Sequence, residues 1–152
     1  MGNIKIVLLS ILVFCSCSQE KKIELLPPSY EYIDSEGESH KEVFYLVDNT
    51  TVQDIDSFVC TIIDTINIKK IEHYVIVFFQ SDFTLDSKFK HNLDHPIYWQ
   101  DKNFRWGYYW HNGKFYQRID KDDNIYFSAS SSKKFQKQKT SLNFMQEGSC
   151  FD

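Results

Sequence analysis

Apolar residues spaced three and four positions apart predict one main helix in the middle of the chain. The apolar positions are Val52, Ile55, Val59, Ile62, Ile63 and Ile66, with Phe58 beside them. Polar side chains fill the opposite side, so the spacing is typical of an amphipathic helix of about 16 residues. Thr50 and Gln53 have the spacing of a capping box, which predicts that the helix starts next to Thr50.

Two apolar segments flank this helix and predict strands. Residues 42–48 form a compact apolar segment before the helix, and residues 74–79 are apolar at every position after it. Continuous apolar character is typical of a strand that is covered on both faces, so residues 74–79 are expected at the centre of a sheet. Strand, helix and strand together predict a β-α-β unit.

An aromatic hairpin is predicted around Asn112 and Gly113, because both residues tolerate the positive φ angles of a tight type I′ turn. The expected cross-strand pairs are Trp110 with Phe115, Tyr109 with Tyr116, and Trp106 with Ile119. Alternation places Phe104, Trp106, Tyr108 and Trp110 on one face of the strand. The predicted fold class is α+β: one main amphipathic helix packed on a mixed sheet that ends in an antiparallel, aromatic-rich hairpin or meander.

The N-terminus has a different pattern. Lys5 precedes an apolar stretch, residues 6–14, interrupted only by Ser10, and Cys15 and Cys17 follow among serines. About nine apolar residues suit a secretory signal and fall short of the ~20 that span a bilayer.

A signal that ends on cysteine resembles the lipobox of bacterial lipoproteins. The resemblance covers the first 18 residues and implies a lipid on the cysteine and a location in the cell envelope. Cys17 is the preferred site because small Ser16 precedes it, whereas bulky Phe14 precedes Cys15, the alternative. N-myristoylation is excluded because its motif needs Ser or Thr where Ile6 stands.

These features predict three regions. Residues 1–16 are the signal peptide, residues 17–41 are the lipidated cysteine and a flexible polar tether, and residues 42–152 form a single small α+β domain. Within the tether, a short edge strand around residues 23–26 is the alternative. Removing residues 1–16 leaves 16 basic and 21 acidic residues, a net charge near −5. This charge argues against nucleic acid as a partner. Cys60 and Cys150 either form a disulfide, which an oxidising envelope permits, or remain two separate thiols.

No motif in the sequence predicts catalytic residues, a metal site or a cofactor. His91 and His95 have helical spacing for zinc, but Pro96 disfavours helical geometry at His95. Asp120, Asp122 and Asn124 start like a calcium loop, which then lacks its glycine and its final glutamate. A solvated turn explains that segment better.

The aromatic hairpin is the strongest candidate for a binding surface, because Trp and Tyr often anchor interfaces. The candidate residues are Trp106, Tyr108 and Trp110 on one face, or Tyr109 and Tyr116 on the reverse, and the competing explanation is that these rings form core. The predicted function is a non-catalytic, membrane-anchored lipoprotein that binds a protein partner in the envelope, as an immunity or inhibitor protein does. A glycan-binding lipoprotein and a small envelope hydrolase are the alternatives.

Overall fold

The computed structural model describes residues 20–83, 100–128, 143–145 and 150–151. In chain order its elements are β1 (Lys22–Ile33), β2 (Ser39–Asp48), α1 (Val52–Thr65), the 3₁₀ turn η1 (Ile68–Lys70), β3 (His73–Gln80), β4 (Phe104–His111), β5 (Lys114–Asp120), β6 (Ile125–Phe127) and β7 (Asn143–Phe144). One α-helix therefore accompanies seven strands in the described part of the chain, which confirms the predicted α+β class. None of the described helices has the length and apolar character that crossing a bilayer requires.

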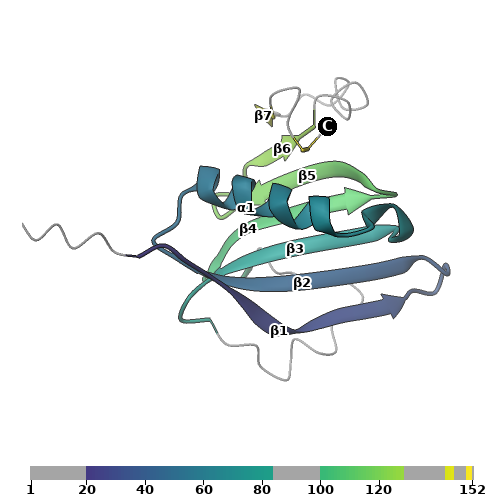
Figure 1. Ribbon diagram of the computed structural model, residues 1–152, viewed down its shortest axis with the longest axis horizontal. Helices are drawn as coiled ribbons and strands as arrows, with labels where there is room; N and C mark the ends of the chain where they lie inside the picture. The colour runs from purple at the N-terminus through teal and green to yellow at the C-terminus, as the bar shows by residue number, and fades with distance from the viewer. Residues whose placement is uncertain (1–19, 84–99, 129–142, 146–149, 152) are drawn as a thin grey trace, which may run out of the picture.

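The strands form one mixed sheet in the order β1-β2-β3-β4-β5-β6-β7. Strands β2 and β3 are parallel and are connected through α1, so the predicted β-α-β unit is present. Strands β3, β4, β5 and β6 then pair antiparallel, and β7 is parallel to β6. The helix lies along one side of this sheet (Figure 1). We call this the helix side and the opposite face the far side.

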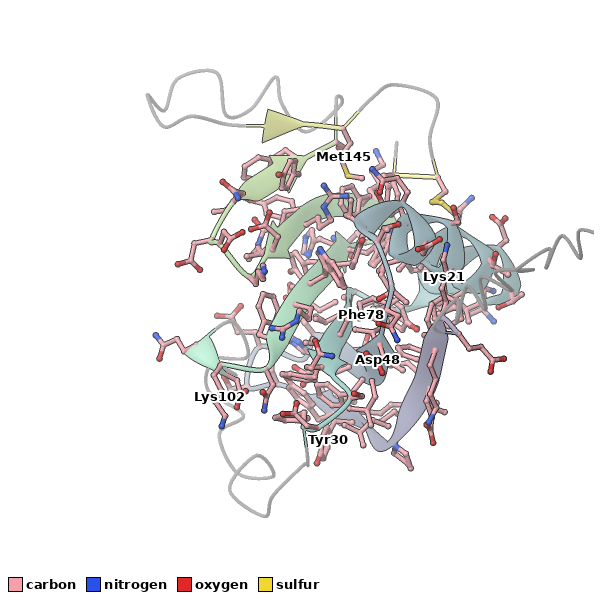
Figure 2. All side chains as sticks on the ribbon, turned by 90° about the vertical axis from the view of Figure 1, so that its left-hand side faces the viewer. Lys21, Tyr30, Asp48, Phe78, Lys102 and Met145 are labelled. Carbon is pink, nitrogen blue, oxygen red and sulfur yellow. A yellow bond between two sulfur atoms is a disulfide. The ribbon has the colours of Figure 1, made fainter. Side chains whose placement is uncertain are left out.

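Both sides of the sheet carry apolar side chains, because residues 43–47 of β2 and residues 74–79 of β3 are apolar at every position. On the helix side, Ile55 and Val59 of α1 pack on Ile76 and Phe78, and all four are fully buried. The far side has a second cluster, which consists of Phe44, Val77, Phe79, Phe83 and Phe104. Figure 2 shows side chains on both sides of the sheet, with Tyr30 on the side away from α1. The prediction that residues 74–79 form a central, covered strand is confirmed.

The helix begins one residue later than the sequence predicted. Thr51, and not Thr50, is the N-cap: its hydroxyl accepts a hydrogen bond from the Asp54 backbone N–H, and the Asp54 carboxylate accepts one from the Thr51 N–H. This is a complete capping box, formed with Asp54 in place of Gln53. The spacing alone could not choose between two adjacent threonines.

The turn between β4 and β5 is the one predicted, with φ of 50° at Asn112 and 73° at Gly113. Trp110 pairs with Phe115 as expected. Beyond that pair a bulge shifts the register, so Tyr109 faces Gln117 instead of Tyr116. A second irregularity, between β3 and β4, places Phe104 in the far-side cluster, so it does not share a face with Tyr108 and Trp110.

The segment predicted as a tether is largely a strand. Strand β1 covers Lys22–Ile33 and pairs antiparallel with β2, from Lys22 opposite Asp48 to Ile33 opposite Ser39. The prediction for residues 17–41 is therefore wrong over most of its length. Its polar composition was misleading because β1 lies at an end of the described sheet, where one strand edge has no neighbour and polar residues are favoured.

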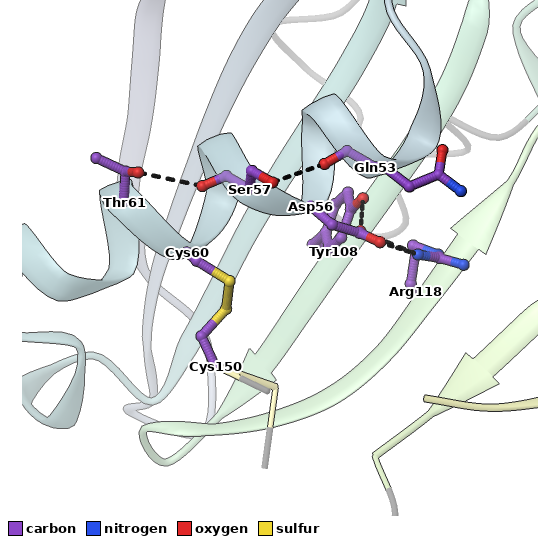
Figure 3. Close-up of a disulfide and its surroundings, with 8 residues drawn as sticks. All are labelled: Gln53, Asp56, Ser57, Cys60, Thr61, Tyr108, Arg118 and Cys150. Carbon is purple, nitrogen blue, oxygen red and sulfur yellow. Dashed lines mark hydrogen bonds and ion pairs between the residues drawn. A yellow bond between two sulfur atoms is a disulfide. The ribbon is translucent and has the colours of Figure 1, made fainter. Parts of the chain in front are cut away.

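Two links hold α1 against the rest of the fold, and they start from Asp56 and Cys60, one helical turn apart (Figure 3). A disulfide joins Cys60 of α1 to Cys150 near the C-terminus, which is the first of the two alternatives left by the sequence. Asp56 accepts hydrogen bonds from the Tyr108 hydroxyl at 2.6 Å and from Arg118 Nη1 at 2.8 Å. The Arg118 guanidinium also lies 4.2 Å from the centre of the Tyr126 ring. We call Asp56, Tyr108, Arg118 and the Cys60–Cys150 disulfide the helix anchor.

Candidate functional site

Three histidines lie side by side on neighbouring strands of the far side. His40 of β2 is the register partner of His73 of β3, which in turn is opposite His111 of β4. The His40 and His73 rings are stacked with centroids 4.2 Å apart, and His73 and His111 are 4.8 Å apart. Tyr32 of β1 extends the row by stacking on His40 at 4.7 Å.

Carboxylates surround these rings. Asp34 Oδ2 lies 2.9 Å from His40 Nε2, and Glu38 contacts His73 Nε2. The three histidines with Tyr32, Asp34, Glu38 and Tyr109 make up what we call the histidine cluster. The hydrogen bond to His40 lowers the pKa of Asp34, and backbone N–H donors assist. The carboxylate is therefore ionised at neutral pH, with its charge directed at the His40 ring.

Tyrosine hydroxyls complete the cluster. Tyr109 contacts His73 Nδ1 through its hydroxyl, and its ring stacks on His73 with centroids 5.9 Å apart. Burial raises the pKa of Tyr109 to about 12, and burial together with Glu42 does the same for Tyr32. Both hydroxyls are thus neutral near pH 7 and can donate or accept a hydrogen bond.

Local structure fixes the positions of these side chains. In the turn between β1 and β2, the Asp34 carboxylate accepts the backbone N–H groups of Glu36 and Glu38, both at 2.9 Å, and Gly37 adopts a φ of 86°. Ser39 at the start of β2 is tied to Glu72 before β3, since each backbone N–H bonds to the other's side chain. The starts of the two parallel strands are therefore held together.

The β4–β5 turn is also bonded to the segment just before β3. The Asn112 backbone N–H bonds to the Glu72 carbonyl at 2.7 Å, so His111 is held next to His73. Gly113 approaches Lys69 so closely that a Cβ atom there would lie 3.0 Å from the Lys69 Cα, and its φ is positive. Any other residue at position 113 would disturb this contact.

An open groove of about 360 Å³ adjoins the histidine cluster at the end of the β1–β2 hairpin. It is lined by Glu31, Tyr32, Ile33, Ser39, His40, Lys41, Lys70 and Ile71. Ile33 is 73% exposed, the highest value among the exposed large hydrophobic residues of the described chain. The groove combines exposed apolar surface with charged residues of both signs.

The predicted binding residues divide between the two sides of the sheet. Tyr108 and Trp110 are buried under α1 at 0% and 2% exposure, and Trp106 packs against the same core. The prediction that these three residues form a contact surface is therefore wrong, because Tyr108 and Trp110 are buried in the helix-side core and only Trp106 is partly exposed. Tyr109 and Tyr116 lie on the far side, partly exposed and in edge-to-face contact with each other.

The remaining sequence candidates fall into two groups. Cys15, Cys17, His91 and His95 lie outside the described residues. Asp120 is described, and its carboxylate accepts the backbone N–H groups of Asp122 and Asn124 at 2.9 and 3.0 Å. This is the local turn that the sequence favoured over a calcium loop.

Tyr109 is the one residue of the histidine cluster that the sequence predicted as a binding residue. A usable signal was present: His40 and His73 come just before the apolar parts of the two strands of the predicted β-α-β unit, which the structure shows to be parallel. Parallel strands begin at the same end of a sheet, so their preceding residues become neighbours. The separation of 33 residues hid this relation.

No model of a known protein family matches the chain, and no curated protein or solved structure is detectably similar to it. Function must therefore be argued from the geometry of the chain itself.

Proposed function

We propose that this chain is a lipid-anchored protein of the bacterial cell envelope whose domain binds a protein partner and does not catalyse a reaction. The lipoprotein-like signal and the preferred lipidation site, Cys17, support the anchor. The groove at the end of the β1–β2 hairpin supports the binding role. An inhibitor or immunity protein is one example of such an envelope protein.

The position of β1 brings the domain close to the membrane under this proposal. Lys22 follows Cys17 by five residues, which span at most about 18 Å when fully extended. Lys22 pairs with Asp48, whereas His40 is eight residues away along β2, a distance of about 26 Å. The groove and the histidine cluster thus lie at the end of the sheet remote from the lipidated Cys17, where a partner has access.

The groove has the anatomy of a protein interface, and this observation carries the proposal. Ile33 and Ile71 supply apolar surface, and Glu31, Lys41 and Lys70 supply a charged rim. A sugar ring needs an exposed aromatic face on which to stack. One face of the Tyr32 ring already stacks on His40, so the groove favours a protein over a glycan.

Capture from envelope extracts with matched variants tests the binding role. Ile33→Asp places a charge in the groove, while Leu25→Asp makes the same change at an exposed position (55%) near the other end of β1. We expect a protein that crosslinks to the wild type and to Leu25→Asp but not to Ile33→Asp. Equal capture by both variants would remove the groove from the proposal. Release of the captured material by soluble oligosaccharides would favour the glycan alternative.

Metabolic labelling with palmitate tests the anchor. The label should disappear in Cys17→Ala and persist in Cys15→Ala. The reverse result would move the lipid to Cys15, and a label unchanged in both variants would contradict lipidation at this motif.

A further inference from the structure

The histidine cluster brings three potential metal ligands together from separate parts of the chain. Glu38 lies in the β1–β2 turn, His40 in β2 and His73 in β3, and one potential donor atom from each lies within 4.8 Å of the others. We propose that Glu38, His40 and His73 bind a divalent transition-metal ion of the zinc class. This site goes beyond partner binding and is testable with the metal alone.

The distances are close to those that coordination requires. Zinc binds imidazole nitrogen and carboxylate oxygen at about 2.0–2.2 Å, which separates tetrahedral ligands by about 3.4 Å. Donor atoms within 4.8 Å reach that geometry through side-chain rotation. The His40 and His73 rings are 11° from parallel, so one of them must turn for both lone pairs to meet one ion.

The partners of the two rings are those that orient metal-binding histidines. His73 Nδ1 contacts the Tyr109 hydroxyl and Nε2 contacts Glu38. With an ion on Nε2, the ring proton is on Nδ1 and the Tyr109 hydroxyl accepts it. An ion between Nε2 and Glu38 replaces their hydrogen bond. The Asp34 carboxylate contacts His40 Nε2, which leaves Nδ1 of His40 as the atom that binds the ion. Carboxylate and hydroxyl groups behind ligating histidines fix the tautomer and raise ligand basicity.

The backbone holds the three ligands in place without help from the ion. His40 and His73 are register partners in the sheet, and the Glu38 N–H is bound by Asp34. The side chains of His40, His73 and Glu38 are 19%, 14% and 39% exposed, so the site is sheltered but open to entry from solvent.

The donor set also selects the class of ion. Two imidazoles with one carboxylate suit zinc, nickel or copper and disfavour calcium and magnesium, which prefer oxygen ligands alone. Three protein ligands leave the fourth position of a tetrahedral ion for water or an external group.

Titration calorimetry with zinc chloride tests the site on the full chain, purified in detergent without a polyhistidine tag. We expect saturable binding of one ion per chain. Glu38→Gln and His73→Gln should weaken binding more than tenfold, and Tyr109→Phe, which removes only the hydroxyl behind His73, by about tenfold. Circular dichroism verifies that each variant is folded.

Glu36→Gln is the matched control, since Glu36 lies in the same turn and its side chain is exposed. Its affinity for zinc should equal that of the wild type. Titration with cobalt adds a spectroscopic readout, because four-coordinate cobalt absorbs visible light strongly and this band should vanish in His73→Gln. Absence of saturable zinc binding, equal weakening by Glu36→Gln and Glu38→Gln, or a cobalt band that survives His73→Gln would each overturn the proposal.

Discussion

The helix side and the far side of the sheet use similar polar groups in opposite ways. In the helix anchor, Asp56 accepts hydrogen bonds from Tyr108 and Arg118, which are both buried, and Arg118 is only 8% exposed. In the histidine cluster, Asp34 and Glu38 remain 29% and 39% exposed beside stacked rings. The two hydrogen-bond donors of the first arrangement are buried, whereas the paired histidines and carboxylates of the second are all partly exposed.

This difference indicates that the helix anchor stabilises the fold and that the histidine cluster is the place for a ligand. A buried charge without its partner is costly, so the helix anchor must stay intact for the helix to remain on the sheet. Partly exposed ion pairs contribute less to stability than buried ones, so the histidine cluster can exchange its internal contacts for a ligand at a smaller cost. The following predictions test this division.

The largest effect is expected from the disulfide of the helix side. Replacing Cys60 and Cys150 together by Ser should lower the free energy of unfolding by about 4 kcal/mol, because the bridge links residues 90 positions apart. Urea denaturation with and without a reductant measures this. The wild type should lose stability in reductant while the double variant does not respond. Identical midpoints for the oxidised wild type and the double variant would contradict the prediction.

Asp56→Ala should cost about 3 kcal/mol, because it leaves the Arg118 guanidinium buried without its carboxylate. Asp64→Ala, at an exposed position of the same helix, is the control and should change stability by less than about 0.5 kcal/mol. Adding Arg118→Leu to Asp56→Ala should recover part of the loss. Equal losses for Asp56→Ala and Asp64→Ala would show that the Asp56–Arg118 pair does not stabilise the fold.

Two adjacent tyrosines compare the two sides directly. Tyr108→Phe removes a buried hydroxyl bound to the Asp56 carboxylate and should cost about 2 kcal/mol. Tyr109→Phe removes a hydroxyl from the half-buried histidine cluster and should cost less than about 1 kcal/mol. Chemical denaturation of both variants measures the difference. A larger loss for Tyr109→Phe would reverse the comparison.

A smaller effect is expected at the helix cap. Thr51→Ala should cost about 1 kcal/mol because it removes the hydroxyl that accepts the Asp54 N–H. Thr50→Ala is the matched control, since Thr50 precedes the cap, and should have less than half of this effect. Thermal unfolding of both variants distinguishes the two threonines, and a greater loss for Thr50→Ala would restore the sequence-based assignment.

The smallest effect concerns pH. Hydrogen bonds from Lys21 and from the Thr51 backbone lower the pKa of Asp54 to about 2. A carboxyl pKa that is lower in the folded state stabilises the fold above the ordinary value near 4, and this contribution is lost as pH falls toward 2. A carbon NMR titration of the carboxyl group measures this pKa. Lys21→Gln should raise it, and a midpoint near 4 in the wild type would contradict the assignment.

The sequence predicted the parts of the fold that depend on local order. The periodic apolar residues from Val52 to Ile66 predicted α1, and the unbroken apolar segment predicted β3. Asn112 and Gly113 predicted their turn because so few residue pairs tolerate positive φ at both positions. Local composition failed for β1, whose polar residues are compatible with either a tether or the end strand of a sheet.

The histidine cluster could not be predicted from local patterns. Alternation along β4 placed Tyr108 and Tyr109 on opposite sides, but only the position of α1 decided that Tyr108 is the buried one. In the same way, His40, His73 and His111 are separated by more than 30 residues at each step. Each is unremarkable within its own segment.

The sequence by itself therefore determined the helix, the central strand, the tight turn and a lipoprotein-like N-terminus, because each depends on residues that are neighbours in the chain. The tertiary structure decided the burial of the aromatic rows, the disulfide and the assembly of the histidine cluster. These features depend on strand register and on the side that the helix covers, and both are set by packing between residues far apart in the sequence.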